Sequence, residues 1–239
     1  MRPSGMLVRC LRRPIGVWPA VCVTVAVLAV TNVANHRWAS PIEPVTAVAV
    51  SALLFGVLWW AGGTWAEAGL DPASWARGAR WAGVLVGIVA VVYLAGALLP
   101  MTRDLFEDER YDRLTGAQVA WRVLVTVPFG TVLLEEVAFR GVLYGLLLRA
   151  RGVVWATAVS STLFGLWHVL PSLHLTAAKP ALTPVFGDAP LGVVAAVLFT
   201  AAAGVLFCEL RRRSGSLLAP MGLHWAVNAL GYVAGFLLR

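Results

Sequence analysis

The sequence predicts an all-α fold, a polytopic membrane bundle of about seven transmembrane helices. Of its 239 residues, 59% are hydrophobic and only 13% are charged, and the mean hydropathy is +0.79. Soluble domains carry about 25% charged residues, so this chain lacks the polar atoms that a globule needs in water. Its apolar runs are too long for barrel strands, and a helix pairs its backbone groups internally. A soluble domain and a disordered chain are both excluded.

Seven apolar runs are long enough to cross a bilayer, which takes about 20 residues in a helix. The first run is longer than the apolar part of a signal peptide and no clear cleavage site follows it, so we interpret it as a retained span. A short amphipathic stretch at the membrane interface is predicted at 64–80, between the second and third spans. The expected spans are 15–34, 44–63, 81–100, 121–148, 152–170, 189–210 and 217–237.

Arginines flank the apolar runs, and their distribution predicts the orientation of the chain. The net charge of +7 comes from 18 Arg and one Lys. In a soluble protein it would suggest nucleic acid, which we do not expect as a partner here. With the N-terminus in the cytoplasm, the inner segments hold eleven basic and three acidic residues, and the outer segments hold seven of each. Positive charge favours the inside, so we expect a cytoplasmic N-terminus and an outer C-terminus.

The chain is expected to form one integral membrane domain over 1–239, because no internal repeat interrupts it. Its Arg-rich, Lys-poor composition suggests a GC-rich bacterial genome and hence the bacterial plasma membrane. The acidic outer loop at 102–113 is expected to be solvated. Disulfides and cysteine-ligated metals are improbable, because the cysteines form no even framework. They are Cys10, Cys22 and Cys208.

Six strongly polar side chains lie inside the apolar runs, where a charged group costs about 2.5–3.5 kcal/mol. Such residues face the interior of a bundle and are candidates for function. They are Glu135, Glu136, Arg140, His168, His224 and Asn228.

Helix geometry sorts these residues. Glu136 and Arg140 are four apart, with the acid first, so they lie on one face as a favourable ion pair. Glu135 is rotated by about 100° from Glu136, which leaves it to face another group. An uncompensated carboxylate in a low-dielectric cleft is suited to act as a general base. His224 and Asn228 also share a helix face, and two neighbouring donors can form an oxyanion hole.

These residues form three motifs on separate spans: E-E-x-x-x-R at 135–140, F-x-x-x-H at 164–168 and H-x-x-x-N at 224–228. In this order they resemble the motifs of the CPBP family, which comprises CAAX proteases, including Rce1-like endopeptidases, and bacteriocin-processing and abortive-infection proteins. The resemblance covers 118–238, the expected catalytic core. The three spans and the interfacial segment of 1–117 match only in general character.

The resemblance implies an intramembrane glutamate-dependent endopeptidase that acts on a membrane-associated or lipidated peptide. By this resemblance, Glu135 with His168 would activate the hydrolytic water, and His224 with Asn228 would stabilise the tetrahedral oxyanion. The neighbouring ion pair would support the site. No metal or other cofactor is expected. The substrate and the oligomeric state are unknown from the sequence.

Three aromatic side chains of the same motifs are interpreted as candidate walls of a substrate cleft: Phe164, Trp167 and Trp225.

Several alternatives stay open at this point. A zinc-dependent protease could use the same glutamate and histidines, although H-x-x-x-N is an atypical zinc motif and no H-E-x-x-H is present. A transporter with a proton relay would predict internal symmetry, which is absent from the sequence. A non-catalytic immunity or binding protein could retain the motifs. The polar residues could also serve only as a buried ion pair and as interhelical hydrogen bonds.

Overall fold

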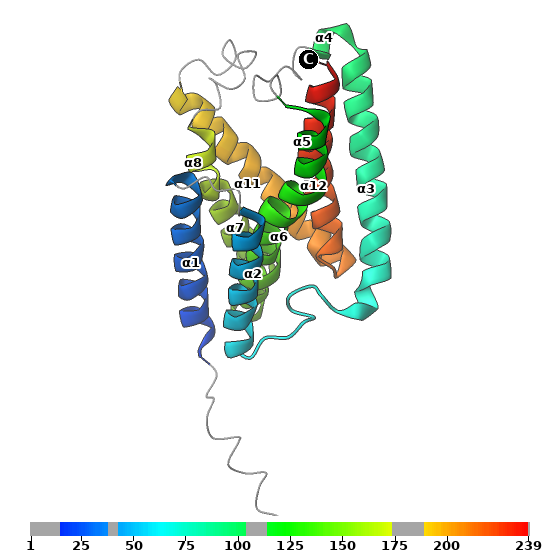
Figure 1. Ribbon diagram of the computed structural model, residues 1–239. Coiled ribbons are helices and arrows are strands. Elements are labelled where there is room, and N and C mark those ends of the chain that lie inside the picture. Colours follow the sequence, from blue (N-terminus) through cyan, green and yellow to red (C-terminus); the bar gives the residue numbers. More distant parts are fainter. Residues whose placement is uncertain (1–14, 38–42, 104–113, 174–188, 239) are drawn as a thin grey trace, which may run out of the picture.

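The computed structural model describes residues 15–37, 43–103, 114–173 and 189–238, and every regular element in these ranges is a helix (Figure 1). The predicted all-α fold is therefore confirmed. Five long helices are α1 (Val17–Arg37), α2 (Glu43–Trp60), α3 (Pro72–Leu98), α11 (Ala189–Ser214) and α12 (Leu218–Leu238). Between α3 and α11 lie α4 (Pro100–Arg103), α5 (Gly116–Trp121), η3 (Arg122–Val132), α6 (Leu133–Glu135), η4 (Glu136–Leu143), α7 (Tyr144–Trp167) and α8 (Val169–Ser172).

Six helices in the described ranges are long and apolar enough to cross a membrane, and the fourth, Gly116–Trp167, has 52 residues. Gly152 interrupts this helix with a φ of 80°, a conformation that glycine adopts at little cost. Ser160 Oγ donates to the carbonyl of Phe139 at 2.7 Å, whereas a straight helix would separate these residues by about 30 Å. The chain therefore folds back at Gly152, in agreement with the two spans predicted on either side of it.

The predicted interfacial stretch is divided between two structures. Its first part forms turns at 65–69, and α3 begins at Pro72, nine residues before the expected third span. Asp71 caps this helix because its carboxylate accepts from the backbone N–H of Ala73 at 3.0 Å. Proline at the first helical position needs no hydrogen-bond partner for its nitrogen. These local signals start the helix before its apolar run.

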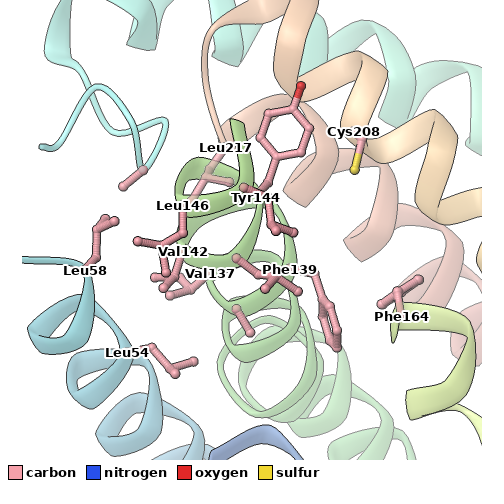
Figure 2. Packing of buried hydrophobic residues seen from close by; sticks show 14 of the residues in the cluster. Leu54, Leu58, Val137, Phe139, Val142, Tyr144, Leu146, Phe164, Cys208 and Leu217 are labelled. Carbon is pink, nitrogen blue, oxygen red and sulfur yellow. The ribbon is translucent and has the colours of Figure 1, made fainter. Parts of the chain in front are cut away.

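The centre of the bundle is formed by η4 and the beginning of α7, where every residue of η4 is buried. Leu54 and Leu58 of α2 lie on one side of this segment, and Phe164 and Cys208 lie on the other (Figure 2). The central helix is thus enclosed by neighbours, and the polar side chains that it carries are held away from the lipid.

The chain enters α1 and leaves α12 at opposite ends of the bundle (Figure 1). A chain that crosses the membrane an odd number of times has this arrangement, which agrees with the seven predicted spans. Most of the predicted solvated loop, at 104–113, lies outside the described residues. The four arginines before the first span also lie outside them: Arg2, Arg9, Arg12 and Arg13.

Candidate active site

The helix that carries the two glutamates is wound more widely than an α-helix over η3 and η4. Pro128 lies inside η3, and a proline cannot continue the ordinary ladder because it has no N–H and clashes with the preceding turn. Wide π-helical turns recur at functional sites. Here both Glu135 and Glu136 reach His224. As expected from the 100° rotation, Glu136 pairs with Arg140, whereas Glu135 faces other groups, Trp167 and His224.

Glu136 is completely buried and contacts two cationic or donor groups. Its Oε1 lies 3.3 Å from Arg140 Nη1, which is the ion pair predicted from their spacing. The same oxygen lies 2.8 Å from His224 Nδ1. Since a carboxylate only accepts, Nδ1 carries a proton and donates to it. Glu136 therefore connects the central helix to α12 and orients the imidazole of His224.

Arg140 is a fully buried cation enclosed by aromatic rings. Its guanidinium carbon lies 3.9 Å from the ring centre of Phe164, 4.7 Å from that of Phe207 and 5.9 Å from that of Phe139. Ring faces attract cations, most strongly where water is excluded. The aromatic rings and the carboxylate of Glu136 together compensate the desolvated charge of Arg140.

Glu135 has one oxygen engaged and one directed at His224. Trp167 Nε1 donates to Oε1 at 3.0 Å. Oε2 has no hydrogen-bond partner within the part of the chain that the structure describes, and it lies 3.7 Å from His224 Nε2. The two oxygens of the Glu135 carboxylate therefore differ in hydrogen bonding: Oε1 accepts from Trp167, and Oε2 has no partner among the described residues.

His168 lies just after the end of α7 and is held by a local hydrogen bond. Its backbone N–H donates to the carbonyl of Gly165, which leaves the carbonyl of Phe164 for the side chain. Nδ1 donates to that carbonyl at 2.8 Å. The F-x-x-x-H spacing thus fixes the tautomer, and Nε2 is left as the acceptor.

The four predicted site residues meet at one cavity of about 1080 Å³. Glu135 comes from α6, His168 from the end of α7, and His224 and Asn228 from successive turns of α12. Phe164 and Trp167 also line this cavity, so two of the three candidate cleft residues lie in its wall. Glu136 and Arg140 lie behind it and contact residues that form its surface.

Trp225 does not line this cavity, so the structure does not place it beside the other two candidate cleft residues. It contacts a separate, smaller pocket between α3, η3 and α12, and its indole N–H donates to the carbonyl of Val123 at 3.0 Å. One residue along an α-helix is a rotation of about 100°, which turns Trp225 away from the side that His224 faces.

Several cavity residues escaped the sequence analysis. Phe207 of α11 stacks on His224 with ring centres 5.2 Å apart, but an aromatic residue in an apolar run carries no signal of this kind. Asn32 is a polar residue inside the first apolar run, which could have marked it. The other polar residues that reach the cavity from α1 and α2 are Asn35, His36 and Glu43.

Among the described residues, no three His, Cys, Asp or Glu side chains are grouped closely enough to hold a metal ion. The acids and histidines are instead directed at one another and at backbone carbonyls.

The membrane-length helices, and the cavity on which the polar motif residues meet, define an integral membrane protein with a candidate active site within the bundle. Residues 117–230 match the family model described as type II CAAX prenyl endopeptidase Rce1-like. The match includes all three motifs and confirms the family predicted from them, which indicates a membrane protease. No curated protein and no solved structure matches the chain.

Proposed function

We propose that this protein is an intramembrane endopeptidase that hydrolyses a peptide bond of a membrane-associated or lipidated substrate. The observation that carries the proposal is the convergence of Glu135, His168, His224 and Asn228 on one cavity. These groups supply a base, an acceptor and two donors, which is the set that water-mediated peptide hydrolysis requires.

Glu135 Oε2 is the proposed base, because Oε1 is already engaged by Trp167. The distance of 3.7 Å from Oε2 to His224 Nε2 is too long for a direct hydrogen bond, so Oε2 is available to take a proton from the attacking water. His168 Nε2 accepts a hydrogen bond from the same water and orients it. Nδ1 of this ring is held by the carbonyl of Phe164, which keeps Nε2 an acceptor.

In the proposed reaction, one proton passes from the water to Glu135 and then from Glu135 to the leaving amine. Glu135 takes a proton from the water while the water oxygen bonds to the scissile carbonyl carbon. The C–N bond then breaks, and the departing amine takes the proton from Glu135. The products are a carboxylic acid, which keeps the second proton of the water, and an amine, and the carboxylate of Glu135 is regenerated.

His224 and Asn228 are the proposed donors to the oxyanion of the tetrahedral intermediate. This role requires a proton on Nε2 of His224 as well as the proton that Nδ1 donates to Glu136, and His224 lines the cavity. The amide of Asn228 lies one turn further along the same cavity-facing side of α12. Donors held in place before the reaction stabilise the developing charge without reorganisation.

The proposed mechanism uses no metal. In the zinc-dependent alternative, Glu135 Oε2 and histidine Nε2 atoms would bind the ion, because the hydrogen bonds of Glu135 and His168 engage only Oε1 and Nδ1. Chelation tests this alternative, as described below.

The proposal is tested by comparing membrane proteomes of cells that express the wild-type chain or the Glu135→Gln variant. We expect new peptide C-termini, or lost precursors, only with the wild type, while both proteins accumulate equally in the membrane. Identical proteomes from the two cell populations would favour the non-catalytic binding protein.

A further inference from the structure

Asn32 lies in the first membrane-length helix, outside the residues 117–230 that match the family model. Ala20, Thr24 and Leu28 of α1 are buried at intervals of four residues, and Asn32 continues this row. Residues four apart share a helix face, so the amide points toward the rest of the bundle. A polar group in a membrane span needs a partner there.

The partner of Asn32 is the carbonyl of Trp167, at the end of α7. The helical donor for this carbonyl would be the N–H four residues later, but that residue is Pro171, which has none. Carbonyls left over at a helix end require another donor. Asn32 Nδ2 supplies it, with a hydrogen bond of 3.0 Å.

The side chain of Trp167 continues this connection to the proposed base. Its indole is nearly buried and packs edge-on against Phe139 with ring centres 5.9 Å apart. Nε1 donates to Glu135 Oε1 at 3.0 Å. Two hydrogen bonds therefore join α1 to the catalytic carboxylate through a single residue.

We propose that Asn32 is a positioning residue for peptide hydrolysis. By holding the backbone at Trp167, it directs the indole N–H to Oε1 of Glu135 and leaves Oε2 near His224 without a hydrogen bond from a described residue. This inference rests on the proposed function. It assigns a role in the reaction to a helix that lies outside the family match.

Kinetics separate positioning from general packing. The probe is a quenched-fluorescent peptide with a prenylated CAAX terminus in phosphatidylcholine vesicles. Asn32→Leu preserves the size of the side chain and removes the donor, and we expect kcat to fall about tenfold with KM unchanged. The matched control is Thr31→Val, because the Thr31 hydroxyl donates within α1, to the carbonyl of Val27. This control should retain the wild-type kcat.

The double variant tests the route through the indole. Trp167→Phe keeps the backbone carbonyl but removes the N–H, so Asn32→Leu should lower kcat no further in that background. If the fold losses in kcat of the two single variants multiply in the double variant, Asn32 acts by packing alone. That result would overturn the proposal.

A spectroscopic readout requires no substrate. The ¹⁵N indole resonance of Trp167, assigned as the signal that Trp167→Phe removes, should move in Asn32→Leu and in Glu135→Gln but not in Thr31→Val. An unmoved resonance in Asn32→Leu would overturn the inference, even for an active protease. Cleavage by Glu135→Gln would instead overturn the proposed function, while a moved resonance would still support the contact.

Discussion

His224 Nδ1 donates a 2.8 Å hydrogen bond to Oε1 of Glu136, the same oxygen that faces Arg140. Glu136, the second glutamate of the E-E-x-x-x-R motif, therefore orients the imidazole of His224 on α12. Its neighbour Glu135 lines the cavity, and its Oε2 has no hydrogen-bond partner among the described residues. Adjacent acids thus occupy two different environments, which is how two identical side chains can take different roles.

Arg140→Met should strongly destabilise the protein, because it leaves the carboxylate of Glu136 buried without its cation. Breaking a buried pair from one side costs about 3–5 kcal/mol. Denaturation in detergent micelles measures the loss in the free energy of unfolding. Arg213→Met is the control, because that side chain is 61% exposed in its pair with Glu209, and exposed pairs contribute about 1 kcal/mol or less. Equal losses for the two variants would contradict the role assigned to Arg140.

Asn228→Leu should lower kcat by about 10²–10³-fold, the usual effect of removing one oxyanion donor. KM should change little, because the lost interaction forms only in the transition state. Trp225→Phe is the matched control on the same helix, since Trp225 lies outside the catalytic cavity. That control should retain kcat and lose about 1 kcal/mol of stability with its hydrogen bond to Val123. A normal kcat in Asn228→Leu would remove Asn228 from the mechanism.

Chelation should leave the activity of the purified protein unchanged. The proposed base, acceptor and donors are all protein side chains that line the cavity. The measurement is the rate of cleavage after dialysis against a chelator and again after addition of zinc. Loss of activity with recovery on zinc would establish the metal-dependent alternative.

A reporter fused after residue 239 should lie outside the cytoplasm. The described helices begin and end at opposite ends of the bundle (Figure 1), and the excess of arginine on the predicted inner segments places the N-terminus inside. Alkaline phosphatase and green fluorescent protein fusions report the two compartments. Fluorescence from the C-terminal fusion together with an inactive phosphatase would reverse the proposed orientation.

The sequence was sufficient to predict the helical membrane fold and the ion pair of Glu136 with Arg140, because both follow from rules within one helix. The meeting of distant motifs was predicted through family resemblance. The roles of Asn32 and Phe207 as neighbours of the site depend on how α1 and α11 pack, and no residue spacing encodes that packing. Trp225 lies at another pocket for a local reason, because residues adjacent in sequence do not share a helix face.

The most direct test of the central claim is the cleavage rate of an identified membrane substrate by wild-type and Glu135→Gln proteins reconstituted in vesicles. Glutamine retains the shape of the side chain and an acceptor for Trp167 but cannot take the proton of the attacking water. We expect cleavage by the wild type and a loss of at least about 10²-fold in the variant, with equal insertion of both proteins. Undiminished cleavage by Glu135→Gln would contradict the mechanism.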